Sequence, residues 1–136
     1  MSDPRPYVAV VDDEESVRRA LVRLLRASAF DVEAFASGQS FLEALPARRP
    51  DCLVLDIQMA GLTGRDLQRH LAVCEVRIPV IIMTAYDEPM MREQCLADGA
   101  YAYFRKPLRG DALMASINAA ITHGPHNSPL QNAARP

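Results

Sequence analysis

The sequence predicts an α/β fold with a doubly wound parallel sheet, and two patterns along its 136 residues indicate it. Apolar runs of four or five residues recur, and stretches with the period of an amphipathic helix lie between them. The runs are rich in β-branched residues, which is typical of strands buried on both faces of a parallel sheet. Five alternations of strand and helix imply right-handed crossovers, with helices on both faces. For a chain this short we expect the flavodoxin-like (βα)5 arrangement, with the strand order 2-1-3-4-5.

Five strands are predicted from the apolar runs. The three continuous runs are residues 7–11, 52–55 and 80–83, and the two weaker ones are residues 32–36 and 102–105. The first helix is expected over about residues 15–28, with its arginines mostly on a solvent-exposed face. The second helix is expected to begin after Ser37, a favourable N-cap, and to run to about residue 45.

The other three helices have clear signals of their own. Thr63-x-x-Asp66 is a capping-box pattern, so the third helix is expected to begin at Thr63 and to end near Cys74. Proline is favoured at the first helical position and glycine just after the last, so the fourth helix is expected between Pro89 and Gly99. The fifth helix is predicted from apolar residues at four-residue spacing, namely Leu113, Ile117 and Ile121.

The composition is that of a soluble cytoplasmic domain. A net charge of −2, with 49% apolar and 24% charged residues, gives no reason to expect nucleic-acid or membrane binding through bulk charge. No apolar stretch approaches the ~20 residues that span a bilayer, and residues 1–6 are too polar for a signal peptide. The cysteines and histidines show no metal-site or redox spacing, so reduced thiols are expected.

Charged or polar residues follow four of the predicted strands. Asp12 and Asp13 follow the first, Asp56 the third, Thr84 the fourth and Lys106 the fifth. Parallel strands end at one edge of the sheet, and ligands bind there near the reversal of strand order. Because the first and third strands are neighbours in the predicted order, their three carboxylates should share one shallow pocket.

Such a cluster favours a metal ion. Three carboxylates within a few ångströms repel one another, by about 4 kcal/mol for each pair at an effective dielectric near 20. One lysine cannot offset this, whereas a hard divalent cation can, and an all-oxygen site with room for water suits Mg²⁺, with Mn²⁺ as a substitute. The ion would also neutralise a transferring phosphoryl group. The apolar strand around Asp56 predicts that it is the most buried of the three carboxylates and hence the nucleophile.

Six short motifs lie at or near the strand ends. They are Val11-Asp12-Asp13-Glu14, Leu55-Asp56-Ile57-Gln58-Met59, Gly61-Leu62-x-Gly64, Thr84-Ala85, Gly99-Ala100 and Lys106-Pro107. Together they resemble the receiver domain of two-component response regulators, most closely the FixJ type. The resemblance implies a receiver domain over residues 6–123, and residues 124–136 read as a flexible tail or a truncated interdomain linker.

The resemblance implies a role for each carboxylate. Asp56 would accept the phosphoryl group from the phosphohistidine of a sensor histidine kinase. Asp13 and Asp56 would ligate Mg²⁺ directly, together with the backbone carbonyl of Gln58. Asp12 would act mainly through ordered water.

The resemblance also implies a switch. Lys106 would pair with the phosphoryl oxygens, and its bond to Pro107 would be cis. Thr84 would bond a phosphoryl oxygen after transfer, and Tyr103 would be the aromatic residue that swings inward with it. The switched surface would lie on the fourth helix, the fifth strand and the fifth helix. Tyr101 and Tyr103 have one residue between them, so both side chains are expected on that side.

The expected output is control of transcription. FixJ-type receivers carry a helix-turn-helix after a linker, and no such module is present in this sequence. We expect a DNA-binding effector beyond the linker, and the alternative is a stand-alone receiver that acts by protein contact or in a phosphorelay. The domain itself would turn over no outside substrate and bind neither nucleic acid nor membrane, and a phosphorylation-dependent homodimer is a further expectation.

One loop departs from the family. Receivers usually have proline where this sequence has Ala60, so this loop should be looser. Gln58 and Tyr86 occupy positions that in receivers tune the access of water to the aspartyl phosphate.

Two other classes of protein share parts of the pattern. A hydrolase of the haloacid dehalogenase type needs a second acid two residues after the nucleophile, where this sequence has Gln58. A flavodoxin-like cofactor binder needs a phosphate-cradling loop after the first strand, where Asp-Asp-Glu-Glu-Ser would repel phosphate. Both are disfavoured.

Overall fold

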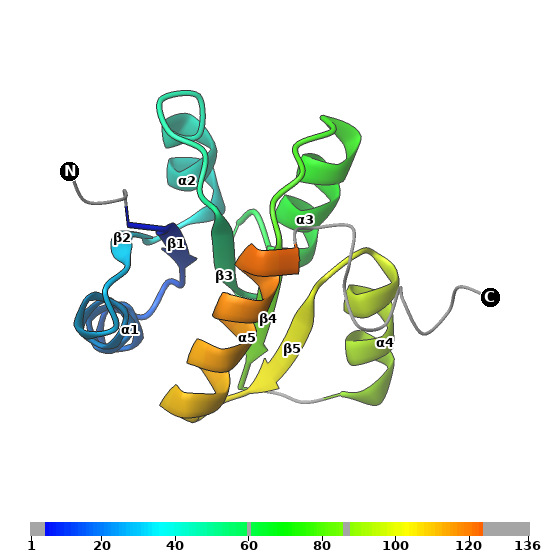
Figure 1. The fold of residues 1–136 in the computed structure, drawn as a ribbon. Helices are drawn as coiled ribbons and strands as arrows, with labels where there is room; N and C mark the ends of the chain where they lie inside the picture. The colour runs from blue at the N-terminus through cyan, green and yellow to red at the C-terminus, as the bar shows by residue number, and fades with distance from the viewer. Residues whose placement is uncertain (1–4, 60, 86–87, 124–136) are drawn as a thin grey trace.

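Five parallel strands form one sheet in the order β2-β1-β3-β4-β5, which confirms the predicted order (Figure 1). The computed structural model describes residues 5–59, 61–85 and 88–123. The strands are β1 (Tyr7–Val11), β2 (Asp31–Phe35), β3 (Cys52–Asp56), β4 (Val80–Thr84) and β5 (Ala102–Arg105). The helices are α1 (Glu15–Ala27), α2 (Gly38–Ala44), α3 (Gly64–Val73), α4 (Pro89–Ala97) and α5 (Gly110–His123).

The sheet separates two apolar cores. On one face α2, α3 and α4 bury Phe41, Leu67 and Cys95 against the strands. On the other face α1 and α5 bury Leu25 and Ile117, and α5 lies in front of the strands in Figure 1. Every residue of β1, β3 and β4 is buried, as their continuous apolar runs predict.

The predicted helix ends are confirmed by their local geometry. The Ser37 side chain accepts a backbone hydrogen bond in the first turn of α2. The hydroxyl of Thr63 accepts from the Asp66 N–H at 3.1 Å, and the Asp66 carboxylate accepts from the Thr63 N–H at 3.3 Å, so the capping box is complete. Pro89 is the first residue of α4, and Gly99, just beyond its end, has a φ of 103° that favours glycine.

β2 is displaced by one residue from the predicted range 32–36. Its pairing with β1 begins at Asp31, opposite Tyr7, and ends at Phe35, opposite Val11. An edge strand takes its limits from the hydrogen bonds that its single neighbour supplies, and this information is not in its own sequence.

The predicted direction of Tyr101 is wrong. Tyr103 belongs to the core under α2, α3 and α4, whereas Tyr101 belongs to the core under α1 and α5. Side chains alternate between faces only inside a strand, and β5 begins at Ala102, after Tyr101. The two tyrosines therefore lie on opposite faces of the sheet.

The buried face of α5 includes two of the three apolar residues from which the helix is predicted. Leu113, Ile117 and Ala120 are buried, while Ile121 is half-buried. Steps of four and three residues together follow a helix face better than two steps of four, because the helix has 3.6 residues per turn.

Several predictions concern residues outside those described. They are the tail over residues 124–136 and the loop positions Ala60 and Tyr86. The domain limits 6–123 also stay a prediction. Of the helices in the described part of the chain, none is long and apolar enough to cross a membrane. The thiols of all three cysteines are free.

The start of α3 lies against the end of β3. The Gly64 N–H donates to the Ile57 carbonyl at 3.3 Å, and a Cβ at position 64 would lie 2.5 Å from the carbonyl oxygen of Asp56. Because the atoms in the way are backbone, they cannot turn aside as the end of a flexible side chain can. Glycine is therefore required here by close approach.

Gly64→Ala is predicted to lower the free energy of unfolding by about 1–3 kcal/mol, the usual cost of overpacking. Gly110→Ala is the matched control, because its Cβ would meet only the Leu24 side chain at 3.4 Å. That variant should lie within about 1 kcal/mol of the wild type, since alanine favours the helix. Urea denaturation measures both values, and equal destabilisation of the two variants would contradict this explanation.

Candidate functional site

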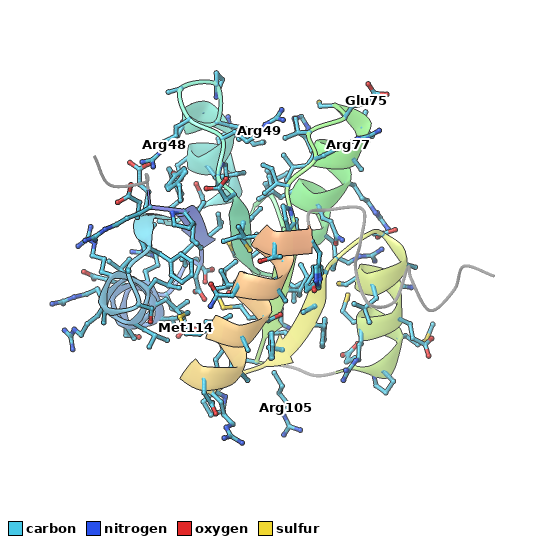
Figure 2. All side chains as sticks on the ribbon, in the orientation of Figure 1. Arg48, Arg49, Glu75, Arg77, Arg105 and Met114 are labelled. Atoms are coloured by element: carbon cyan, nitrogen blue, oxygen red, sulfur yellow. The ribbon has the colours of Figure 1, made fainter. Side chains whose placement is uncertain are left out.

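The candidate site lies at the carboxyl end of the sheet. Asp56 is the last residue of β3, and Asp12 follows the last residue of the neighbouring β1. Figure 2 shows Arg105, the last residue of β5, at the opposite end of the sheet from Arg49 and Arg77, which precede β3 and β4. The strands thus bring residues distant in sequence to one edge, as predicted.

Three carboxylates converge at this edge. One oxygen from each of Asp12, Asp13 and Asp56 lies within 4.8 Å of the other two. Asp12 and Asp56 are buried, whereas Asp13 is exposed. The donor set consists only of oxygen atoms and is open to solvent on one side, so it fits a hard divalent cation that keeps part of its water shell.

Lys106 bridges the two buried carboxylates. Its Nζ lies 2.9 Å from Asp12 Oδ2 and 3.5 Å from Asp56 Oδ2. Burial works against the charged amine, but the hydrogen bond to Asp12 and the charges of both carboxylates outweigh it and raise the pKa of Lys106. The Lys106–Pro107 bond is cis, as the resemblance implies.

Asp12 is at least as buried as Asp56, which corrects the expectation that Asp56 is the most buried carboxylate. The exposed fractions are 0% for Asp12 and 3% for Asp56. Asp12 continues the ladder beyond β1, because its N–H donates to the Phe35 carbonyl at 3.1 Å. The inner position of β1 between β2 and β3 then covers Asp12 on both sides.

Hydrogen bonds fix Asp12 on every side. Its Oδ1 accepts from the Glu14 N–H at 2.8 Å, and its Oδ2 accepts from Lys106. Its backbone carbonyl accepts from the Arg18 guanidinium at 2.8 Å. Sequence reasoning missed the contact of Arg18, because the helical pattern groups Arg18 with the solvent-exposed arginines of α1.

The environment of Asp56 opposes its negative charge. Burial raises its pKa to about 6, and the nearby Asp12 carboxylate adds to this, against the lowering by the Gln58 N–H and Lys106. The Gln58 N–H donates to Asp56 Oδ1 at 3.0 Å. Asp56 is therefore a carboxylate of unusual basicity that still ionises below neutral pH.

Thr84 on β4 lies next to this cluster, and Tyr103 on the neighbouring β5 is paired with Ile82, two residues before Thr84. Thr84 is the last residue of β4 and is fully buried, and its carbonyl accepts from the Lys106 N–H at 2.7 Å. The Tyr103 ring is buried, with the Arg92 guanidinium 5.8 Å from its centre. A direct backbone link therefore connects the threonine to the lysine of the site.

Comparison with known proteins gives a consistent set of relatives. Residues 8–118 match the family described as the response regulator receiver domain. The transcriptional regulatory protein TdiR of Thauera aromatica is 36% identical over 125 residues, which are 92% of this chain and 55% of TdiR. The DNA-binding transcriptional regulator NtrC of Escherichia coli is 36% identical over 119 residues, which are 88% of this chain and 25% of NtrC. The chain thus spans about half the length of TdiR and a quarter of the length of NtrC.

Two solved structures are similar to this chain in sequence and in fold. A response regulator receiver protein from Burkholderia phymatum is 43% identical, with a TM-score of 0.78, over 87% of this chain and 96% of its own. The structure of FixJ-N is 32% identical, with a TM-score of 0.81, over 90% of this chain and 97% of its own.

Proposed function

Because the chain belongs to the family of response-regulator receiver domains, we propose that Asp56 accepts a phosphoryl group from the phosphohistidine of a sensor histidine kinase in a Mg²⁺-dependent reaction. The observation that carries this proposal is the convergence of three carboxylates and one lysine at the carboxyl end of the sheet. The two rival classes are disfavoured by Gln58, which replaces the second acid that the hydrolase needs, and by the acidic loop that follows β1.

Asp56 would supply the nucleophile. A pKa of about 6 leaves it mostly ionised at pH 7. One carboxylate oxygen forms a bond to phosphorus as the phosphorus–nitrogen bond to the kinase histidine breaks, and the electron pair of that bond returns to the imidazole. The domain itself would turn over no outside substrate.

The neighbouring residues would hold the ion. Asp13 and Asp56 would be direct ligands, with the backbone carbonyl of Gln58 as a third. When bound, Mg²⁺ supplies positive charge to the phosphoryl oxygens. Asp12 already bonds Glu14 and Lys106 through its two oxygens, which supports a contact through water.

The Lys106 amine would move toward the phosphoryl group. Its Nζ now lies closer to Asp12 than to Asp56, and a short movement would bring it to a phosphoryl oxygen on Asp56. The phosphoryl group carries about two negative charges where the ionised Asp56 carboxylate carried one, and it presents three acceptor oxygens, which makes that movement favourable.

Thr84 and Tyr103 would carry the signal. The Thr84 hydroxyl would donate to a phosphoryl oxygen, and the position of Tyr103 would respond to the movement of Thr84. The surface of α4, β5 and α5 would then change.

The partners and the output follow from the relatives. TdiR is described as a transcriptional regulatory protein, and this chain corresponds to 55% of its length. We infer a sensor kinase as phosphodonor, a phosphorylation-dependent homodimer, a cytoplasmic location and a DNA-binding effector as output.

Acetyl phosphate with Mg²⁺ is predicted to add one phosphoryl group to the wild-type chain. Asp56→Asn should abolish the addition, because an amide oxygen is a poor nucleophile, and chelation of the metal should slow it at least tenfold. Intact-mass spectrometry measures the product. Asp31→Asn, which changes a half-buried carboxylate at the other end of the sheet, is the control and should be labelled like the wild type. Equal labelling of Asp56→Asn and the wild type would contradict the proposal.

Thr84→Ala is predicted to become phosphorylated but to lose most of its phosphorylation-dependent dimerisation, because the hydroxyl that senses the phosphoryl group is missing. Thr84→Ser keeps the hydroxyl and should behave like the wild type. Sedimentation velocity with and without acetyl phosphate measures the dimer. Unchanged dimerisation of Thr84→Ala would argue against a role for Thr84 in the switch.

A further inference from the structure

Helix α4 has few apolar contacts. Among its nine residues, all of them described, only Cys95 is buried. Met91 and Leu96 pack half-buried against the core, and Met90 is 70% exposed. The apolar surface that α4 buries is therefore small for a helix of its length.

Polar side chains of α3 hold α4 instead. The Arg65 guanidinium donates to Gln94 Oε1 at 2.8 Å and to Asp98 Oδ2 at 3.0 Å. Gln68 Nε2 donates to the Cys95 carbonyl at 3.0 Å, and this side chain is buried. These contacts bind one helix to the other.

The geometry of Arg65 fixes both the position and the rotation of α4. Its two acceptors are Gln94 on α4 and Asp98, the C-cap residue of α4; they are four residues apart, so they lie on the same side of the helix one turn from each other. A planar guanidinium that bonds both acceptors defines where that face lies. The Arg65 side chain is only 19% exposed and that of Asp98 34%, so water competes weakly for this pair.

The other end of the same segment lies against the candidate phosphoacceptor. Arg65 directly follows Gly64, which approaches the backbone of Asp56 too closely for any Cβ. The Gly64 N–H is also bonded to the Ile57 carbonyl. A displacement of the backbone at Asp56 is therefore passed to the first turn of α3 by direct contact.

We propose that Arg65 is a positioning residue that couples the state of Asp56 to the position of α4 through α3. The coupling rests on the proposed function, because phosphorylation is the change that it transmits. It provides a second route to α4, distinct from the one through Thr84 and Tyr103.

Hydrogen exchange of the full chain, followed by mass spectrometry with and without acetyl phosphate and Mg²⁺, tests the coupling. In the wild type, exchange in residues 88–98 should change on phosphorylation. In Arg65→Ala, the same residues should exchange several-fold faster than in the wild type before phosphorylation. The change in their exchange on phosphorylation should be less than half of the change in the wild type. Labelling of Asp56 and the response of β5 should persist.

The controls separate coupling from stability. Arg69→Ala removes a neighbouring arginine that is 58% exposed and 3.9 Å from Asp98, and it should behave like the wild type. Arg65→Glu combined with Asp98→Arg restores an ion pair of reversed sign and should recover at least half of the response. The double variant also places a negative charge in the first turn of α3 and a positive charge at the C-terminal end of α4, which are the ends that favour these charges.

Each outcome decides one proposal. An α4 response in Arg65→Ala equal to that of the wild type, or no wild-type response in α4 despite full labelling, would overturn the coupling alone. Absence of labelling in the wild type would overturn the proposed function. In that case, the exchange rate of α4 in the unphosphorylated variants would still show whether Arg65 positions the helix.

Discussion

Repulsion between carboxylates at the end of two adjacent strands is the constraint on which the rest of the structure depends. The sheet order places Asp12 and Asp56 side by side, both buried, with a third carboxylate at the solvent edge. Among the described residues, Lys106 pairs with the carboxylates of this cluster and is shared between two of them, whereas Arg18 bonds only the backbone carbonyl of Asp12. A negative excess remains, and the proposed binding of a cation and the proposed reaction of Asp56 with a phosphoryl group both rest on it.

Asp12 and α4 are held in different ways. Asp12 is bonded at its N–H, its carbonyl and both carboxylate oxygens, so a change at Asp56 cannot easily be absorbed there. α3 touches Asp56 through Gly64, and α4 is held largely by polar contacts. Polar contacts can be exchanged without opening a core, which is why the proposed coupling ends on α4.

Much of this arrangement could be predicted from the sequence, because local rules determine it. Continuous β-branched runs indicated the inner strands, and the Thr63 capping box and Pro89 located two helix starts correctly. The geometry of a parallel sheet then sufficed to bring Asp12, Asp56 and Lys106 together. The nucleophile role of Asp56 and the divalent cation were inferred from the carboxylate cluster, and the remaining roles came from the family resemblance; all of them stay predictions.

The rest depends on contacts between distant residues, which leave no periodic signal. The Arg65 contacts join residues 29 and 33 positions apart. The burial of Asp12 depends on a bond to the end of β2, and the direction of Tyr101 depends on where β5 begins. None of these can be read from a motif.

The claim that the site opposes the negative charge of Asp56 is tested most directly by the free energy of unfolding of Asp56→Asn and of the wild type, measured as a function of pH in the presence of a chelator. The folded-state pKa of about 6 exceeds the usual 3.8, so folding favours the protonated carboxyl. That contribution is complete at low pH and is lost as the pH rises through 6. The variant, which is always neutral, should therefore unfold with a free energy larger than the wild type by on the order of 1–3 kcal/mol at neutral pH. The gain should shrink as the pH falls toward 4, and Mg²⁺ should reduce it at neutral pH by stabilising the wild type. A wild type at least as stable as Asp56→Asn at neutral pH without metal would contradict the claim.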